Sequence, residues 1–315
     1  MNSVSTDRIF LRNRFKKRVC QQLKRNENKM PELPEVETMR RGLSQQVVGQ
    51  KIIKIETTYP RMILTGFDSL QKKLTNHVIT GVLRRGKYLI FQFDTPLCLI
   101  SHLRMEGKYR LDLTTQHLKH DHISLTLISP TLTNPTAKDH KFLVYSDVRK
   151  FGTWELVSAD KVEAFFEAKK IGPEPTYKTF AESLFYEKLS TSSKKIKPYL
   201  LEQTLVAGLG NIYADEVLFR AKIHPETPAH LLSKKDVHLL HDSIIEILQK
   251  AINLGGSTIR TYKNSFGKEG EMQNELKVYA KQNTACPNCG TKIKKIKLSG
   301  RGAHFCPHCQ SVKTK

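Results

Sequence analysis

The spacing of apolar side chains predicts one helix followed by a series of short strands. After Pro34, which suits a helix start, apolar residues recur at helical intervals as far as Gly49, a stop signal: Val36, Met39, Leu43 and Val47. Short apolar runs separated by turn signals then follow at Lys51–Thr57, Val78–Leu83, Tyr88–Phe93, Leu97–Leu103, His122–Ile128, Phe142–Ser146 and Thr153–Val157. Many strands at such spacing are typical of a sandwich or a barrel. We therefore expect a β-rich domain with a leading helix over residues 30–160.

The apolar period becomes helical in the second half of the chain, after the turn-rich segment Ile171–Pro175. Helical patterns follow over Ile196–Val206, from Ile212 to about Lys222, and over Val237–Ala251. Ser233 and Asp236 form a capping-box pattern before the last of these. We expect a linker over residues 161–178 and a helical domain over residues 179–265.

Cysteines dominate the end of the chain. They form two C-x-x-C pairs separated by sixteen residues: Cys286 with Cys289, and Cys306 with Cys309. Four thiolates at this spacing suit tetrahedral Zn²⁺, and the cationic segment between the pairs can form a hairpin that grips phosphate. Because thiolates fill all four positions, we expect one structural zinc ion within residues 266–315, with His304 and His308 on the surface.

The charge of the chain favours a polyanionic partner. Its 315 residues carry 52 Lys and Arg against 30 Asp and Glu, a formal net charge of +22. Such a surface binds nucleic acid by releasing counterions from phosphates. A membrane surface is the competing anion, but the sequence has no transmembrane run and no basic amphipathic helix with a lipid-facing aromatic side. Since the cysteines suggest a metal site rather than a disulfide framework, we expect a reducing cytosol.

Residues 1–29 form a basic extension with nine Lys and Arg against two acids, which we expect to be disordered or weakly helical. One interpretation is an Arg-rich segment of the transit-peptide kind. The other, which we favour, is that translation begins at Met30 and the extension is a start-site artefact. The choice matters chemically because the Pro31 nitrogen is a tertiary amide while residue 30 remains attached.

The stretch Met30–Glu37 is the candidate catalytic segment. Removal of Met30 would give Pro31 a free secondary amine, a nucleophile able to attack an electron-poor sugar carbon and form an iminium. Positive charge nearby would lower the pKa of an α-amine below its usual value of about 8 and leave more of it neutral. Glu32 would be the adjacent acid/base. Alternatively, the segment is only a proline-marked helix start with solvated acids.

Clusters that combine cations with glycine lie at the ends of three predicted strands: Arg84–Lys87, His102–Gly107 and Asp147–Gly152. Met105 and Phe151 could be wedges in a base stack, with Arg149 filling hydrogen-bonding space. Alternatively, they are core residues with a solvated cationic rim. In the helical domain the turn Gly208–Asn211 offers backbone N–H groups to a phosphate, and Lys194–Lys197 is another candidate phosphate contact.

In combination these motifs resemble a known family. Pro31–Thr38, Arg85–Leu89, Asp147–Gly152, Gly208–Tyr213 and the four-cysteine finger occur in the order found in bacterial formamidopyrimidine-DNA glycosylases. The resemblance runs from Met30 to about Gln310 and implies an α+β multidomain protein. Its expected parts are an N-terminal β-sandwich, a helix–two-turn–helix domain and a zinc-finger hairpin, with double-stranded DNA in the cleft between them. The implied activity is that of a bifunctional glycosylase and abasic-site lyase that removes oxidised purines, such as 8-oxoguanine and formamidopyrimidines, by β,δ-elimination.

The resemblance also assigns roles by position. Pro31 resembles the Schiff-base nucleophile, Glu32 the acid/base of sugar ring opening, Lys87 the residue of β-elimination, and Arg301 that of δ-elimination or a phosphate grip. The void left by a flipped base is expected to be filled by Met105, Arg149 and Phe151. DNA contacts are expected at His120, Arg149, Asn211 and either Lys194 or Lys195. Lesion-pocket acids are expected at Glu35 and Glu174, under a closing loop at Lys263–Gln273.

Other functions stay open at this point. An endonuclease VIII-type relative acts on oxidised pyrimidines with the same machinery, although Leu33 favours the purine branch because that relative usually has glycine there. If residues 1–30 are retained, a catalytically silent protein that binds damaged DNA becomes the better interpretation. A zinc-ribbon transcription module would leave residues 30–265 without a purpose. We expect a monomer, since no heptad seam or repeat is evident, and no organic cofactor.

Overall fold

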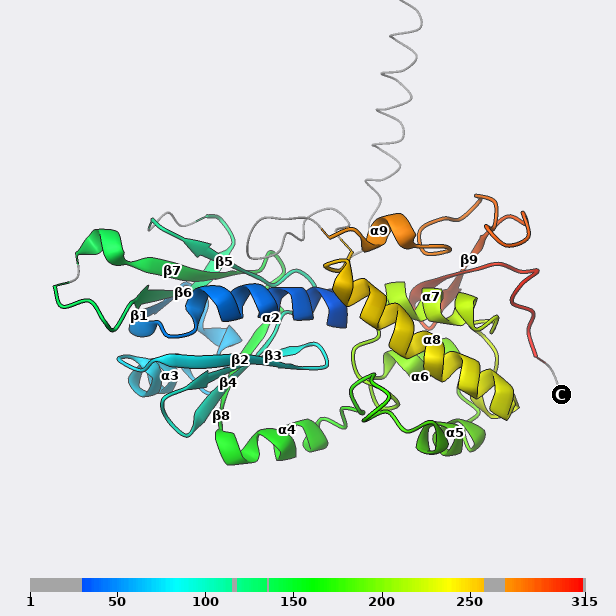
Figure 1. Ribbon diagram of the computed structural model, residues 1–315, viewed down its shortest axis with the longest axis horizontal. Helices are drawn as coiled ribbons and strands as arrows, with labels where there is room; N and C mark the ends of the chain where they lie inside the picture. The colour runs from blue at the N-terminus through cyan, green and yellow to red at the C-terminus, as the bar shows by residue number, and fades with distance from the viewer. Residues whose placement is uncertain (1–29, 115–117, 135, 258–269, 314–315) are drawn as a thin grey trace, which may run out of the picture.

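The computed structural model describes residues 30–114, 118–134, 136–257 and 270–313. Figure 1 shows a sheet-rich lobe and a helical lobe lying end to end, with helix α2 (Leu33–Val47) reaching from the first lobe to their junction. The N-terminus of α2 therefore lies where the two lobes meet.

Two antiparallel four-stranded sheets form the first lobe, in agreement with the predicted sandwich. One sheet has the order β1 (Lys51–Thr57), β6 (Asp121–Ile128), β7 (Lys141–Ser146) and β5 (Lys108–Asp112). The other has the order β2 (Ile79–Arg85), β3 (Tyr88–Phe93), β4 (Leu97–His102) and β8 (Thr153–Ser158). A core that includes fully buried Trp154 and Tyr145 lies in this lobe.

Helix α2 packs its apolar stripe into this lobe, and all four predicted positions are fully buried. Its N-cap is Glu32, whose backbone N–H donates to the Glu35 side chain at 3.0 Å, as in one half of a capping box. This bond fixes where the helix begins. The side chain of Glu32 reaches the second lobe, where it accepts N–H groups at the start of α7. Shorter helices complete the lobe: α3 (Phe67–Leu74) and the 3-10 turns Pro60–Met62, Ala137–Asp139 and Ala159–Lys161.

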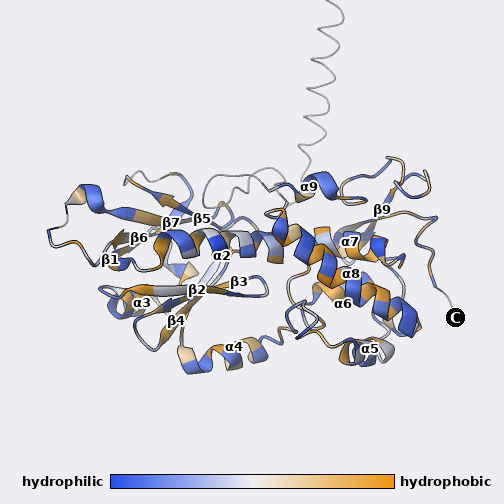
Figure 2. Cartoon of the chain, in the orientation of Figure 1, coloured by the Kyte–Doolittle hydropathy of each residue, from blue (hydrophilic) through white to orange (hydrophobic). Residues whose placement is uncertain are grey.

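The helical lobe has its own apolar core. Its helices are α5 (Glu182–Ser190), α6 (Ile196–Leu201), α7 (Asn211–Arg220) and α8 (Lys234–Asn253), with a 3-10 turn at Ala229–Leu231. Ser233 caps α8 through the predicted capping box, and bands of apolar and polar residues mark the two faces of this helix in Figure 2. Helix α6 ends at Leu201, five residues earlier than predicted, because the chain turns at Gln203 with a φ of 66°. The expected linker contains a helix that the apolar pattern did not predict, α4 (Val162–Ala168).

The last segment carries the short helix α9 (Met272–Glu275) and a hairpin of β9 (Lys294–Leu298) and β10 (Arg301–Phe305), in agreement with the predicted hairpin between the cysteine pairs. His304 corrects one expectation, since it is 1% exposed rather than on the surface, whereas His308 is exposed. Among the described residues, no helix has both the length and the apolar character that a membrane span requires.

Candidate active site at the junction of the two lobes

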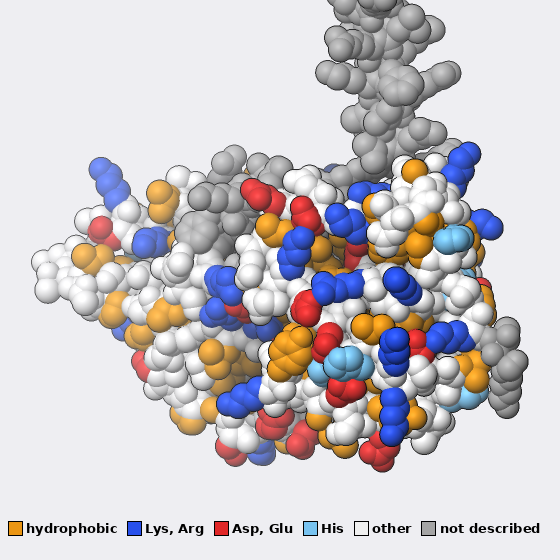
Figure 3. Space-filling view, turned by 45° about the vertical axis from the view of Figure 1, so that its right-hand side comes forward, with side chains coloured by type: hydrophobic (Ala, Val, Ile, Leu, Met, Phe, Trp, Pro, Cys, Tyr) orange, Lys and Arg blue, Asp and Glu red, His pale blue; other side chains and the backbone are white. Residues whose placement is uncertain are grey.

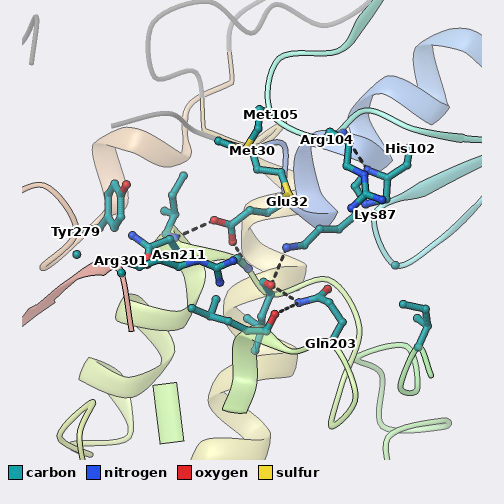
Figure 4. A pocket seen from close by; sticks show the side chains of 18 of the residues that line it. Met30, Glu32, Lys87, His102, Arg104, Met105, Gln203, Asn211, Tyr279 and Arg301 are labelled. Carbon is teal, nitrogen blue, oxygen red and sulfur yellow. Dashed lines mark hydrogen bonds between the residues drawn. The ribbon is translucent and has the colours of Figure 1, made fainter. Parts of the chain in front are cut away.

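A cleft of about 840 Å³ lies where α2, the β2–β3 turn, the start of α7 and the β9–β10 hairpin meet. Figure 4 shows Glu32 near the middle of this cleft, with Lys87 and Arg301 entering from opposite walls. Of the charged Lys, Arg, Asp and Glu residues that line its described part, five are cations and one, Glu32, is acidic. The cations are Lys87, Arg104, Lys295, Lys297 and Arg301. This balance suits a polyanion, and Figure 3 shows in contrast that Asp and Glu accompany the Lys and Arg side chains on the outer face of the helical lobe.

Glu32 is held by the backbone at the start of α7. Its carboxylate accepts hydrogen bonds from the N–H groups of Gly210 at 2.6 Å, Ile212 at 2.8 Å and Tyr213 at 3.3 Å. A helix N-terminus is a natural anion site, so the donors that we expected to meet a phosphate instead hold a carboxylate of the protein itself. Gly210 is needed here because a Cβ atom at this position would overlap the Glu32 carboxyl group.

Burial shifts the protonation of Glu32 and Lys87 in opposite directions. It raises the pKa of the Glu32 carboxyl, a rise that the Lys87 cation opposes and Glu35 increases. It lowers the pKa of Lys87, which the Glu32 carboxylate opposes and the Arg301 cation reinforces. A carboxylic acid that keeps its proton near neutral pH, beside a lysine that loses one easily, is suited to general acid–base work.

A backbone carbonyl holds the amine of Lys87 in place. Its Nζ donates to the Leu209 carbonyl oxygen at 2.7 Å, and the Gln203 side-chain amide donates to the same oxygen at 2.6 Å. Gln203 also accepts from the Gly208 N–H at 2.8 Å, so its side chain braces the glycine turn on both sides. Sequence reasoning missed Gln203, which is distinguished only by its position after a helix and before the turn.

Glu35 lies beneath Glu32 rather than among the residues that line the described cleft. Its carboxylate accepts hydrogen bonds from the Glu32 N–H at 3.0 Å, the Tyr213 hydroxyl at 2.8 Å and the Ser257 N–H at 2.7 Å. Burial raises the pKa of this carboxyl. Glu35 thus joins the start of α2 to the chain just before residues 258–269, and the expected closing loop lies outside the described residues as far as residue 269.

Pro31 is buried beside Glu32, and Met30 lines the cleft with its side chain half-buried. Met30 therefore occupies part of the cleft that Glu32 also lines. Retention of residue 30 has two consequences at once, because it also keeps the Pro31 nitrogen in an amide bond.

The cleft also holds residues of the His102–Gly107 cluster. Nδ1 of His102 accepts a hydrogen bond from the Arg104 N–H at 2.9 Å. Burial, with the Arg104 and Lys87 cations adding to it, lowers the pKa of His102 to about 3, so this ring stays neutral. Met105, one of the expected wedge residues, lines the cleft as well.

The two other expected wedge residues lie on the loop after β7. The Arg149 guanidinium lies 4.7 Å from the centre of the Phe151 ring, which is 51% exposed. Asp147 shapes this loop by accepting the N–H groups of Arg149 at 2.9 Å and Phe151 at 3.0 Å. Gly107 and Gly152 both pack against the Tyr145 hydroxyl, where a side chain on either would collide with it, so the loops that carry Met105 and Phe151 approach each other.

Glu174 has a different place from the one we expected. It accepts hydrogen bonds from the Arg84 guanidinium at 2.7 Å and the Gly86 N–H at 2.5 Å, and its second ion pair is to Arg85 at 3.4 Å. Among the described residues it therefore ties the linker to the β2–β3 turn that carries Lys87, and it is not one of the residues lining the cleft. The sequence around Glu174, which lies between two prolines, does not predict that it pairs with the β2–β3 turn.

The expected DNA contacts are divided. Asn211 lines the cleft, and its side-chain Oδ1 has no hydrogen-bond partner within the described parts of the chain. His120 is half-buried outside the cleft, where its carbonyl accepts the Asp147 N–H at 3.0 Å. The two lysines before α6 make exposed ion pairs, Lys194 with Glu202 at 2.7 Å and Lys195 with Glu226 at 2.6 Å. Such pairs are weak enough for a phosphate to compete with them.

The four cysteines of the finger converge on one point. Their sulfur atoms all lie within 4.8 Å of one another, with Cys286 and Cys309 at 3.9 Å and Cys289 and Cys306 at 3.5 Å. A tetrahedron of thiolates with bonds of about 2.3 Å has edges of roughly 3.8 Å. These residues therefore fit a tetrahedral metal ion, and all four positions are filled by protein.

Comparisons with known proteins agree with this geometry along most of the chain. Residues 30–154 match the formamidopyrimidine-DNA glycosylase N-terminal domain, residues 171–263 its H2TH domain, and residues 285–312 a zinc finger found in FPG and IleRS. A formamidopyrimidine-DNA glycosylase of Lactococcus lactis subsp. lactis is 61% identical over 282 residues, which are 89% of this chain and 99% of that protein.

Solved structures give the same result. A complex of a Lactococcus lactis FPG mutant with Fapy-dG containing DNA has a TM-score of 0.84 and 61% identity over 89% of this chain and 100% of that one. A complex of wild-type Lactococcus lactis FPG (MutM) with an oxidized pyrimidine containing DNA has a TM-score of 0.82 and 60% identity at the same coverage.

Proposed function

Because this chain belongs to the formamidopyrimidine-DNA glycosylase family, we propose that it removes oxidised purines from double-stranded DNA and then cuts the strand at the abasic site. One observation carries this proposal. Glu32, the neighbour of Pro31, is fully buried on the N-terminus of α7 and faces Lys87 in a cleft lined mostly by cations. A proline, an acid with a raised pKa and a lysine with a lowered one are the groups that the chemistry requires.

The nucleophile in this proposal is the Pro31 nitrogen after removal of the residues before it. Its lone pair attacks C1′ of the deoxyribose, and the bond from C1′ to the base breaks as the base leaves with the amine proton. Glu32 donates its proton to the ring oxygen as the C1′–O4′ bond opens, which leaves an iminium between Pro31 and C1′. A secondary amine gives a cationic iminium without further protonation, so Pro31 suits this step.

The iminium then acidifies the hydrogens on C2′. Burial lowers the pKa of Lys87, so its side chain is more easily a neutral amine. This amine takes a proton from C2′, and the 3′-phosphate leaves as the C3′–O bond breaks. A further proton passes from C4′ to water, and the 5′-phosphate leaves as the C5′–O bond breaks. Arg301 faces this region from the opposite wall and can hold a departing phosphate with its guanidinium.

The finger would hold zinc in this proposal, through the thiolates of its four converging cysteines. With no position open to water or substrate, the ion would supply structure rather than chemistry. We also propose that the protein acts as a monomer in the bacterial cytosol and nucleoid, without an organic cofactor.

Borohydride trapping on a duplex with 8-oxoguanine opposite cytosine tests the proposal, with protein that begins at Pro31. We expect a covalent protein–DNA adduct. The informative variant combines Pro31→Gly with Glu32→Gln, because Pro31→Gly alone leaves a primary amine that can still react. No adduct from the unvaried protein, or an undiminished adduct from the double variant, would refute the mechanism.

Oxidised pyrimidines are a second candidate substrate class, because a relative of 60% identity has been solved with an oxidized pyrimidine containing DNA. Leu33, the residue that favoured purines in the sequence, is 1% exposed and packs on the glycine turn at Gly208. It therefore gives no contact that would discriminate between bases. Comparing cleavage of 8-oxoguanine and thymine-glycol duplexes under one condition decides between the two classes.

A further inference from the structure

Arg301 enters the cleft from the turn of the β9–β10 hairpin. It is exposed and follows the two-residue turn Ser299–Gly300 at the tip of the hairpin. Its side chain lines both the main cleft and a second hollow of about 250 Å³ beside α6. Whether its guanidinium faces the cleft therefore depends on how the backbone of this turn is held.

A buried lysine holds that backbone. Lys197, in the first turn of α6, is 1% exposed, and its Nζ donates to the carbonyl oxygen of Gly302, the residue after Arg301, at 2.6 Å. The same Nζ lies 2.7 Å from Oδ1 of Asp215 on α7. Lys197 thus joins α6, α7 and the finger hairpin at one point.

Asp215 holds the hairpin a second time through His304. The main-chain N–H and the ring Nδ1 of His304 both lie 2.9 Å from Oδ2 of Asp215. A carboxylate can only accept, so Nδ1 carries the proton, and the two side chains are completely shielded from water. The His304 ring lies 4.9 Å from that of Tyr279, which lines the cleft.

This network is a poor way to gain stability alone. Withdrawing two charges from water carries a large desolvation cost for each ion, and well-packed apolar residues are often as stabilising. None of the three residues belongs to the cysteine cluster of the finger. The position of Asp215 on α7 gives the network another role. The first turn of α7 binds Glu32, and Asp215 in the next turn binds the hairpin. Helix α7 thus sets the position of Arg301 relative to Glu32.

We propose that Lys197, Asp215 and His304 form a positioning clamp that fixes the hairpin backbone so that Arg301 faces the cleft. None of the three needs to touch DNA. The proposal rests on the proposed function, because its main readout is cutting of damaged DNA, and it holds whether Arg301 serves elimination or grips phosphate.

A double-mutant cycle with Arg301 tests the clamp, with single-turnover cutting of an 8-oxoguanine duplex by protein that begins at Pro31. Lys197→Met keeps the length of the side chain and removes its charge and its hydrogen bond to Gly302. We expect it to slow cutting about tenfold or more, since small misplacements at a reactive centre cost up to about a hundredfold. In the Arg301→Ala background the same change should slow cutting less than twofold, because a clamp acts only through Arg301. An equal slowing in both backgrounds, or an unchanged rate from folded Lys197→Met, would overturn the proposal.

A second pair of variants keeps the test decisive if Lys197→Met does not fold. His304→Phe preserves a ring against Tyr279 but removes the donor to Asp215, and His304→Asn keeps a donor near the position of Nδ1. We expect the first to slow cutting in an Arg301-dependent way and the second to restore it. Equal rates from the two would count against the clamp.

His224→Phe is the matched control for general damage at this interface. His224 is 5% exposed and its ring packs 4.4 Å from that of Phe305, and among the described residues no hydrogen bond, ion pair or ring contact joins it to the clamp residues. Any slowing it causes should be the same with and without Arg301.

Hydrogen exchange of the intact protein separates failure of the clamp from failure of the proposed function, because it needs no substrate. Lys197→Met should speed exchange in the peptide that covers residues 299–303, and His224→Phe should not. Unchanged exchange in both would contradict the clamp even if the unvaried protein cuts DNA. Faster exchange with an unvaried protein that cuts no lesion would instead reject the proposed function.

Discussion

Gly210→Ala is the substitution whose effect follows most directly from the geometry. The backbone of Gly210 is extended, with φ at −123° and ψ at −159°, a conformation open to any residue. Alanine therefore adds no backbone strain at this position. The added methyl would instead lie 2.5 Å from Oε1 of Glu32, where ordinary contact begins near 3.4 Å. The carboxylate must retreat by roughly 1 Å, away from the N–H groups that hold it and from the position that the chemistry requires.

The expected cost is in rate rather than in folding. A displacement of about 1 Å at a reacting group can slow a reaction about a hundredfold, or about 2.7 kcal/mol in the activation barrier. Single-turnover release of 8-oxoguanine measures this rate, and thermal unfolding of the same sample measures stability. We expect base release to fall by one to two orders of magnitude in protein that remains folded.

Gly66→Ala is the matched control. Gly66 has a φ of 83° and open space around its missing side chain, so alanine strains the backbone far from the cleft. With a ψ of 141°, Gly66 lies outside the left-handed helical region, in backbone space used almost only by glycine, so we expect a loss of stability of about 1–3 kcal/mol and an unchanged rate. Wild-type base release by folded Gly210→Ala would refute the role given to the Glu32 carboxylate, and an equal loss in both variants would show that the assay reports folding alone.

Three further predictions concern other parts of the site. Burial lowers the pKa of Lys87, and the Arg301 cation lowers it further. Arg301→Ala should therefore raise the Lys87 pKa, so that abasic-site cutting increases at a higher pH than in the unvaried protein. An unchanged pH profile would show that the two charges do not interact. Chelation of the metal should abolish DNA binding measured by fluorescence anisotropy, because the finger loses the ion that joins its two cysteine pairs; affinity retained without metal would count against that. Phe151→Ala should slow excision while changing the free energy of unfolding by less than about 0.5 kcal/mol, since the ring is 51% exposed. Leu64 is 57% exposed and does not line the cleft, so Leu64→Ala should change neither the excision rate nor the free energy of unfolding. Equal effects of Phe151→Ala and Leu64→Ala would refute the wedge role of Phe151.

Local periodicity predicted much of the fold. The buried stripe of α2, the capping box at Ser233 and the paired cysteines are all signals within a few residues of one another, and each is confirmed. Strand β5 was missed because it is an edge strand in which Tyr109 is the single fully buried residue, so it lacks an apolar pattern. Helix α4 was missed because Phe166 is its single fully buried residue.

Contacts between distant residues could not be predicted in this way. The N–H groups of the glycine turn were expected to meet phosphate, yet they meet Glu32, which lies 178 residues before Gly210. His304 was expected on the surface because its partner, Asp215, is 89 residues away. In each case the decisive partner is a buried carboxylate, and nothing in the neighbouring sequence distinguishes a buried acid from a solvated one.

The central claim is that the Pro31 nitrogen forms the bond to deoxyribose. The most direct test is mass spectrometry of the borohydride-reduced adduct after proteolysis. The account predicts that the sugar remnant lies on the amino-terminal nitrogen of a peptide beginning at Pro31. A remnant on Lys87, or an adduct formed at full rate by protein that still carries residue 30, would contradict it.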